Sequence, residues 1–86
     1  MKLYNSLYAQ VNKAINLADV SVVETPQMSE FQSMIILIHM RSGLIVELVY
    51  ASANARPTQE EANMIADAAV ADYAELVHSL TIFLDE

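Results

Sequence analysis

The sequence predicts a single α+β domain spanning residues 1–86, in which an N-terminal helix and a long C-terminal helix flank a three-stranded antiparallel sheet. Three observations support this fold class. An apolar, β-branched stretch occupies residues 31–50, apolar residues recur at helical spacing near the N-terminus, and a helix-start signal stands at Thr58. A chain of 86 residues has room for one hydrophobic core. We therefore expect one domain with the element order helix, three strands, helix.

The stretch Phe31–Tyr50 predicts a β-hairpin, because β-branched and apolar residues suit a pleated, buried surface. It contains the only glycine, Gly43, and glycine accepts the positive φ that tight hairpin turns require. A two-residue turn at Ser42 and Gly43 would pair Leu37 with Leu48. One face would then carry Phe31, Ile35, Leu37, Leu44, Val46, Leu48 and Tyr50, and the other would carry Met34, Ile36, Ile38, Met40, Ile45, Glu47, Val49 and Ala51. Because both faces are largely apolar, we expect both to be covered.

The segments that precede the hairpin are predicted to form a helix and a first strand. A helical stripe over residues 3–18 consists of Leu3, Leu7, Val11, Ile15 and Ala18. The valines of residues 19–25 predict a short strand that ends at Pro26. With further strands at about 30–41 and 44–52, the sheet becomes a meander in which the second strand is central.

A long helix is predicted to begin after Thr58. Thr58 and Glu61 fit a capping box, in which each side chain accepts a hydrogen bond from the other residue's backbone N–H. The expected buried stripe consists of Ala62, Ile65, Ala69, Tyr73, Leu76, Leu80 and Leu84, with Phe83 beside it. We expect this helix to run for more than about 25 residues, to the end of the chain.

The composition argues against catalysis and against direct nucleic-acid binding. The chain has no cysteine, one glycine and two histidines outside any metal-ligand spacing, so thiolate sites, phosphate-cradling loops and histidine metal motifs are not predicted. No serine stands in a recognisable nucleophile motif. The net charge is −7, whereas affinity for phosphate comes mainly from clustered Lys and Arg. We expect a protein that is not an enzyme and that holds no cofactor or metal.

The sequence also bears on localisation. The first residues are too polar for the apolar segment of a signal peptide. The longest apolar run, Met34–Ile38, is far shorter than the roughly 20 residues of a membrane span. The lack of cysteine suits a reducing compartment. We expect a cytoplasmic protein without membrane contact.

The acidic residues of the C-terminal helix allow two interpretations. Residues 57–86 contain no Lys or Arg, whereas residues 1–56 carry equal numbers of acidic and basic residues, so the whole net charge lies in the last third. Glu60, Asp67 and Glu75 fall on the side away from the buried stripe. They form either a solvated face or a docking face for a basic partner. Asp72 lies near the edge of the apolar stripe, where it should find a hydrogen-bond donor or meet an interface. The predicted partner-binding residues are therefore Glu60, Asp67, Glu75 and Asp72.

The methionine-rich face of the hairpin is a second candidate interface. Methionine gives a flexible, polarisable surface of the type that grips partners. If both helices pack on the opposite face, this one joins a second copy of the chain. The predicted dimer interface consists of Met34, Ile36, Ile38, Met40, Ile45, Glu47 and Val49. The alternative is that one helix covers each face of the sheet.

Two resemblances concern function. The order helix, three strands, helix is similar to that of double-stranded-RNA-binding domains, but their basic helix motif is absent and the last helix here is acidic. Small phage-encoded inhibitors, anti-CRISPR proteins among them, resemble this chain in size, acidity and mixed α/β content. That resemblance implies non-catalytic binding to a basic, nucleic-acid-binding protein. The alternative is a structural or adaptor subunit that joins a larger assembly through an apolar sheet face.

Overall fold

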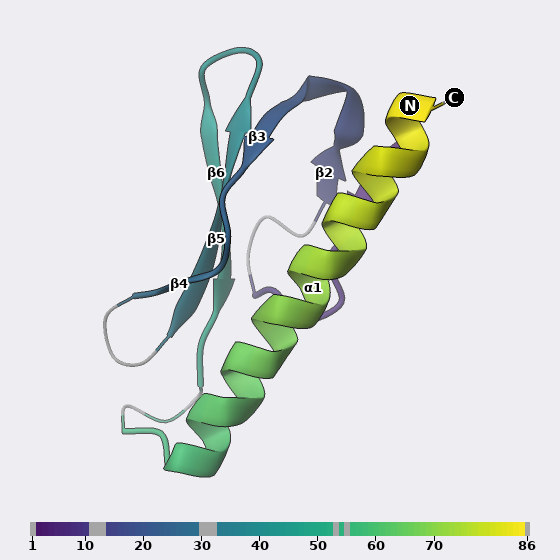
Figure 1. The fold of residues 1–86 in the computed structure, drawn as a ribbon. Helices are drawn as coiled ribbons and strands as arrows, with labels where there is room; N and C mark the ends of the chain where they lie inside the picture. The colour runs from purple at the N-terminus through teal and green to yellow at the C-terminus, as the bar shows by residue number, and fades with distance from the viewer. Residues whose placement is uncertain (1, 11–13, 30–32, 53, 55, 86) are drawn as a thin grey trace.

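The computed structural model describes residues 2–10, 14–29, 33–52, 54 and 56–85. It contains two antiparallel sheets and one long helix, which lies along one side of both (Figure 1). The elements in order are β1 (Leu3–Asn5), β2 (Ala14–Asn16), the 3₁₀ turn η1 (Leu17–Asp19), β3 (Val20–Val23), β4 (Gln27–Met28), β5 (Met34–Met40), β6 (Ile45–Tyr50) and α1 (Gln59–Asp85). The α+β class and the long C-terminal helix are confirmed.

The predicted N-terminal helix is wrong. The described part of residues 3–18 forms the antiparallel pair β1 and β2 and the start of η1. Tyr4 lies opposite Ile15 in this pair, and both side chains are buried, whereas Leu3 and Leu7 are exposed. The burial thus follows the two-residue period of a strand. Asparagine also competes with helical hydrogen bonding, and the Asn16 side chain accepts the N–H of Ala18 to cap η1.

The main sheet has four strands, where three were expected. β5 is central, as predicted, with β6 on one edge and both β3 and β4 on the other. The predicted first strand is present as β3. Pro26 interrupts it because proline has no N–H to donate to a ladder, and the chain then pairs with β5 again as β4. The predicted edge strand is therefore split in two.

The hairpin between β5 and β6 has a different turn from the one predicted. The Gly43 N–H donates to the Met40 carbonyl at 3.0 Å, and the Met40 N–H donates to the Leu44 carbonyl at 2.8 Å. Three residues therefore connect the strands, and Gly43 takes a φ of 94°, which confirms its predicted conformation. The extra residue shifts the register, so that Ile36 lies opposite Leu48 and Leu37 opposite Glu47. A shift of one residue moves every side chain of β6 to the other face.

The corrected register determines which residues lie on the sheet face that α1 covers. The covered face carries Met34, Ile36, Ile38 and Met40 from β5 with Val46, Leu48 and Tyr50 from β6. Ile36, Ile38 and Leu48 are fully buried there, together with Ala69 and Leu76 of α1. The opposite face carries Ile35, Leu37, His39, Ile45, Glu47 and Val49, with Val22 from β3. No helix of the described residues covers that face, which we call the open sheet face (Figure 1).

The helix α1 begins and packs largely as predicted. The Glu61 N–H donates to Thr58 Oγ1 at 3.1 Å, and the Thr58 N–H donates to Glu61 Oε1 at 3.3 Å, which confirms the capping box. The helix has 27 residues, a length of about 40 Å. Leu84 is an exception to the predicted buried stripe because its side chain is 69% exposed. Among the described residues, no helix combines the length and apolar character that a membrane crossing requires.

The turn gives a test of the hairpin. A β-carbon at Gly43 would meet no neighbouring atom within 4 Å, so a substitution there acts through backbone conformation alone. We predict that Gly43→Val lowers the free energy of unfolding by about 1–2 kcal/mol, measured by urea denaturation. Gly43→Asn is the matched control and should lower the free energy of unfolding much less, because asparagine tolerates positive φ. Equal stability of the Val variant and the wild type would contradict this turn.

Candidate functional site

A buried carboxylate joins α1 to both sheets. Asp72 is 1% exposed. The hydroxyls of Tyr4 and Ser6 donate to its two carboxylate oxygens, and the Tyr50 hydroxyl donates to Oδ2 at 2.6 Å. The Ser6 hydroxyl oxygen also accepts the N–H of Ala9 at 2.9 Å. A buried charge is tolerated only where hydrogen bonds replace its hydration, and these three hydroxyls meet that requirement. We call Tyr4, Ser6, Tyr50 and Asp72 the carboxylate cluster.

The electrostatics of the cluster keep one anion among neutral donors. Burial raises the pKa of Asp72, but hydrogen bonds from the Ser6, Tyr4 and Tyr50 hydroxyls and the Leu7 backbone outweigh burial and hold this pKa below its usual range. Burial, followed by hydrogen bonding to Asp72, raises the pKa values of Tyr4 and Tyr50. At neutral pH the ionised Asp72 carboxylate therefore accepts hydrogen bonds, and the neutral hydroxyls donate them. Through these hydrogen bonds the buried Asp72 side chain holds α1 to β1 and β6.

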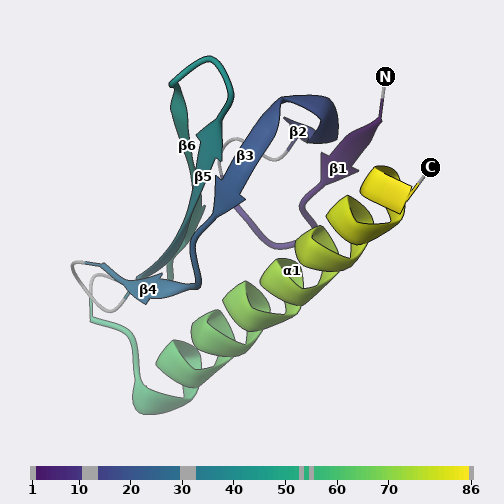
Figure 2. The ribbon, with the colours of Figure 1, turned by 45° about the horizontal axis from the view of Figure 1, so that its top comes forward.

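The cluster fixes residues 2–8 against α1 in the antiparallel direction. Lys2 and Leu3 lie beside Ser79, Ile82 and Phe83. Tyr4 and Ser6 meet the helix at Asp72. Tyr8 lies beside the helical residues 64–71. β1 accordingly runs next to the C-terminal part of α1 in Figure 2. The surface where this segment meets the helix is called the crease.

The crease contains two depressions. One has a volume of about 210 Å³ and is lined by Lys2, Leu3, Leu17, Ser79, Ile82 and Phe83. The other has a volume of about 320 Å³ and is lined by Tyr8, Met64, Asp67, Ala68 and Ala71. Four of the lining side chains are large, apolar and roughly half exposed or more: Leu3, Tyr8, Met64 and Ile82. Apolar side chains that gather on a surface in this way are typical of an interaction site.

The predicted acidic residues take different positions around the crease. Asp67 lines the larger depression. Glu75 is exposed and stands one helical turn from Ala71, on the same side of α1, and Glu60 is exposed near the start of the helix. Asp72 does not belong to this exposed set, because it is buried in the cluster. Of the two environments predicted for Asp72, a donor or an interface, the structure contains the donor.

The Glu61 carboxylate accepts hydrogen bonds at the start of α1. Hydrogen bonds from the Asn54 and Ser52 side chains and from Thr58 lower its pKa. Its carboxylate joins the loop before α1 to the first turn of the helix. Glu61 therefore stabilises the start of α1, whereas Glu60, Asp67 and Glu75 remain on the surface.

The predicted dimer interface mixes residues from the two faces of the sheet. Ile36 and Ile38 are fully buried beneath α1, and Met34 and Met40 pack against the same core. Only Ile45, Glu47 and Val49 lie on the open sheet face. The predicted face is therefore wrong, because the one-residue change in register exchanged the side chains of β6 between faces. The alternative, in which one helix covers each face, is met only in part: α1 covers the methionine-rich face, and no helix of the described residues covers the other.

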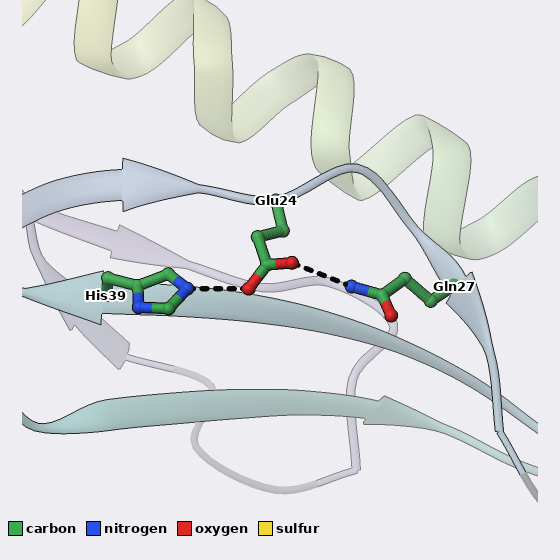
Figure 3. Close-up of polar contacts among 3 residues, drawn as sticks. All are labelled: Glu24, Gln27 and His39. Carbon is green, nitrogen blue, oxygen red and sulfur yellow. Dashed lines mark hydrogen bonds and ion pairs between the residues drawn. The ribbon is translucent and has the colours of Figure 1, made fainter.

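The open sheet face combines apolar and polar residues. Val22 and Ile45 are 53% and 52% exposed. Glu24 accepts a hydrogen bond from Gln27 at 3.1 Å, and its other carboxylate oxygen lies 2.6 Å from His39 Nε2 (Figure 3). These three side chains form a polar row: Glu24 comes from the connection between β3 and β4, Gln27 from β4 and His39 from β5. No three His, Asp or Glu side chains within the described residues are grouped to hold a metal ion.

The chain was compared with models of protein families, with curated proteins and with solved structures, and none of the three comparisons found a match. The geometry of the crease and of the open sheet face therefore supports the functional proposals.

The carboxylate cluster gives a prediction about acid stability. The folded pKa of Asp72 lies below the unfolded value of about 3.9. The unfolded chain therefore binds more protons between these values, and the stabilisation by Asp72 is complete above pH about 4 and lost as the pH falls through the folded pKa. We predict that Asp72→Asn loses about 2–4 kcal/mol of unfolding free energy at pH 7. The difference from the wild type should shrink toward pH about 2.

Urea denaturation followed by circular dichroism at a series of pH values measures this difference. Asp67→Asn is the matched control, because Asp67 is exposed on the same helix. Its stability should follow that of the wild type at every pH. If Asp72→Asn lowers the free energy of unfolding by the same amount at all pH values, the proposed ionisation of the cluster is contradicted.

Proposed function

We propose that this protein is a non-catalytic protein-binding module that docks a basic partner along the acidic side of α1. The observation that carries the proposal is the coincidence of exposed charge and exposed apolar surface. Glu60, Asp67 and Glu75 are exposed on the side of α1 that borders the crease. Apolar surface supplies affinity, and the carboxylates favour partners of positive charge.

The distribution of charge supports a basic partner. The helix α1 contains no Lys or Arg, so its carboxylates have no neighbour of permanent positive charge within the helix. A concentrated negative field accelerates association with a basic protein and discriminates against acidic ones. If the partner uses its basic surface to bind nucleic acid, occupation of that surface blocks the nucleic acid. The most specific form of the proposal is an inhibitor of a nucleic-acid-binding protein.

The charge requirement is tested by removing the three carboxylates. We predict that the triple variant Glu60→Gln, Asp67→Asn, Glu75→Gln keeps its fold but loses a basic partner that the immobilised wild type captures at about 50 mM salt. The wild type itself should release that partner at about 500 mM salt, because screening weakens exposed charge interactions.

The matched control removes three acids that lie outside α1 and do not line the crease: Asp19→Asn, Glu24→Gln and Glu47→Gln. It has the same net charge as the test variant, so total charge cannot explain a difference between them. Retention of the partner by the control and its loss from the test variant would support the proposal. Equal retention by both variants would overturn docking through Glu60, Asp67 and Glu75.

A second candidate function is that of a structural subunit, with the open sheet face as the contact. The half-exposed Val22 and Ile45 favour it, since sheets commonly bury apolar faces against other sheets. Under this proposal two copies associate, and Ile45→Glu converts the dimer to a monomer in sedimentation. The matched control is Leu84→Glu, which places the same charge at an exposed apolar residue of α1. A monomeric wild type at high concentration would remove this candidate.

A further inference from the structure

We infer that the partner's docking element is a basic amphipathic α-helix that lies along the crease. This inference rests on the proposed function and adds the shape of the ligand to it. A flat basic surface would satisfy the carboxylates alone. The two depressions accommodate apolar side chains that project from the ligand. The distance between the depressions and the residues around them indicate that the ligand is a helix.

The separation of the two depressions fits a helical ligand. The α1 residues that line the larger one are 64–71, and those that line the smaller one are 79–83. Their centres are about 14 residues apart, which corresponds to about 20 Å along the helix axis. A ligand helix of about four turns spans the same distance when it runs beside α1. Its apolar side chains at the two ends of one stripe then reach both depressions.

The chemistry of the crease fits a ligand with one apolar face and basic flanks. Leu3 and Ile82 present apolar surface at one depression, and Tyr8 and Met64 do so at the other. Tyrosine and methionine adapt to side chains of different shapes. Asp67 stands in the lining of one depression, and Glu75 lies between the two along α1. Lys or Arg beside the apolar stripe of the ligand would meet these carboxylates.

The α1 wall of the crease favours a helix over an extended peptide. One wall is α1, whose interior N–H and C=O groups already pair within the helix. An extended ligand would find no ladder of hydrogen bonds on that wall, and β-augmentation depends on such a ladder. A helical ligand satisfies its own backbone and binds through side chains, which the depressions accommodate.

The opposite flank of α1 serves as an internal comparison. Val70 and Val77 are exposed there, and neither lines one of the two depressions of the crease. Because Val70 and Met64 are similarly exposed residues of the same helix, the same substitution at each separates binding in the crease from a general change of charge.

The test uses two synthetic peptides of about 18 residues, each composed of Leu and Lys and each labelled for fluorescence anisotropy. One peptide places Leu at helical spacing to form an apolar stripe. The other has the same composition in an order that has no stripe. We expect the full-length protein to bind the amphipathic peptide at least 10-fold more tightly, and bound peptide to gain helical circular dichroism.

Two variants locate the binding. Met64→Lys should weaken binding of the amphipathic peptide at least 10-fold, because it places a cation in the larger depression. Val70→Lys, with the same net charge, should change the affinity less than 2-fold. An equal effect of the two variants would place the peptide outside the crease and overturn the inference.

The remaining outcomes separate this inference from the proposed function. Equal affinity for the two peptides would leave docking by charge intact and overturn the helical ligand. Binding of neither peptide would also overturn the helical ligand, while the capture experiment with the triple variant would still decide the proposed function. If the triple variant binds the amphipathic peptide as the wild type does, the carboxylates have no role and the proposed function fails instead.

Discussion

The fold depends on one buried anion. The Asp72 carboxylate receives hydroxyl groups from the N-terminal segment and from β6, which lie in different sheets. Other contacts also join the two parts of the fold: the Gln10 N–H donates to the Val49 carbonyl at 2.8 Å, and residues of both sheets share the buried core. Because a buried carboxylate that loses its donors is strongly destabilising, the cluster holds three segments in one arrangement. An apolar residue in place of Asp72 could fill the volume but could not orient three hydroxyls.

The crease is a consequence of that arrangement. Tyr4 and Ser6 are held at Asp72, so the chain before them must lie beside the end of α1 and the chain after them beside its first half. The side chains that alternate with the buried ones then point outward, which explains why Leu3 and Leu7 are exposed while Tyr4 and Ser6 are buried. The interaction that stabilises the core thus also creates the apolar surface that a partner could use.

Features with one clear local signal were predictable from the sequence, and features with several local solutions or with distant hydrogen-bond partners were not. Gly43 and the Thr58–Glu61 capping box depend on local geometry and were predicted. The predicted hairpin register was wrong because two-residue and three-residue turns both suit Gly43. The hydrogen bond from the Met40 N–H to the Leu44 carbonyl belongs to the longer turn. The prediction for the N-terminal segment was wrong because β1 pairs with β2, and because Tyr4 and Ser6 are held by Asp72, which stands more than 60 residues away. An Asp within the apolar stripe of a helix was a usable signal for the cluster, but the sequence did not identify Tyr4, Ser6 and Tyr50 as its donors.

The acidic residues of α1 fall into two groups, those whose hydrogen bonds stabilise the fold and those that are exposed. Asp72 and Glu61 accept several hydrogen bonds each and contribute to the structure. Glu60, Asp67 and Glu75 are exposed, and α1 offers them no Lys or Arg at i±4, so ion pairs within the helix do not explain them. Asp85 even lies in the last turn, where the helix dipole disfavours an acid. Glu60 stands in the first turn, where the helix dipole favours an acid. Folding does not account for Asp67 and Glu75 in this way, and their position beside the crease is the feature that a binding role explains.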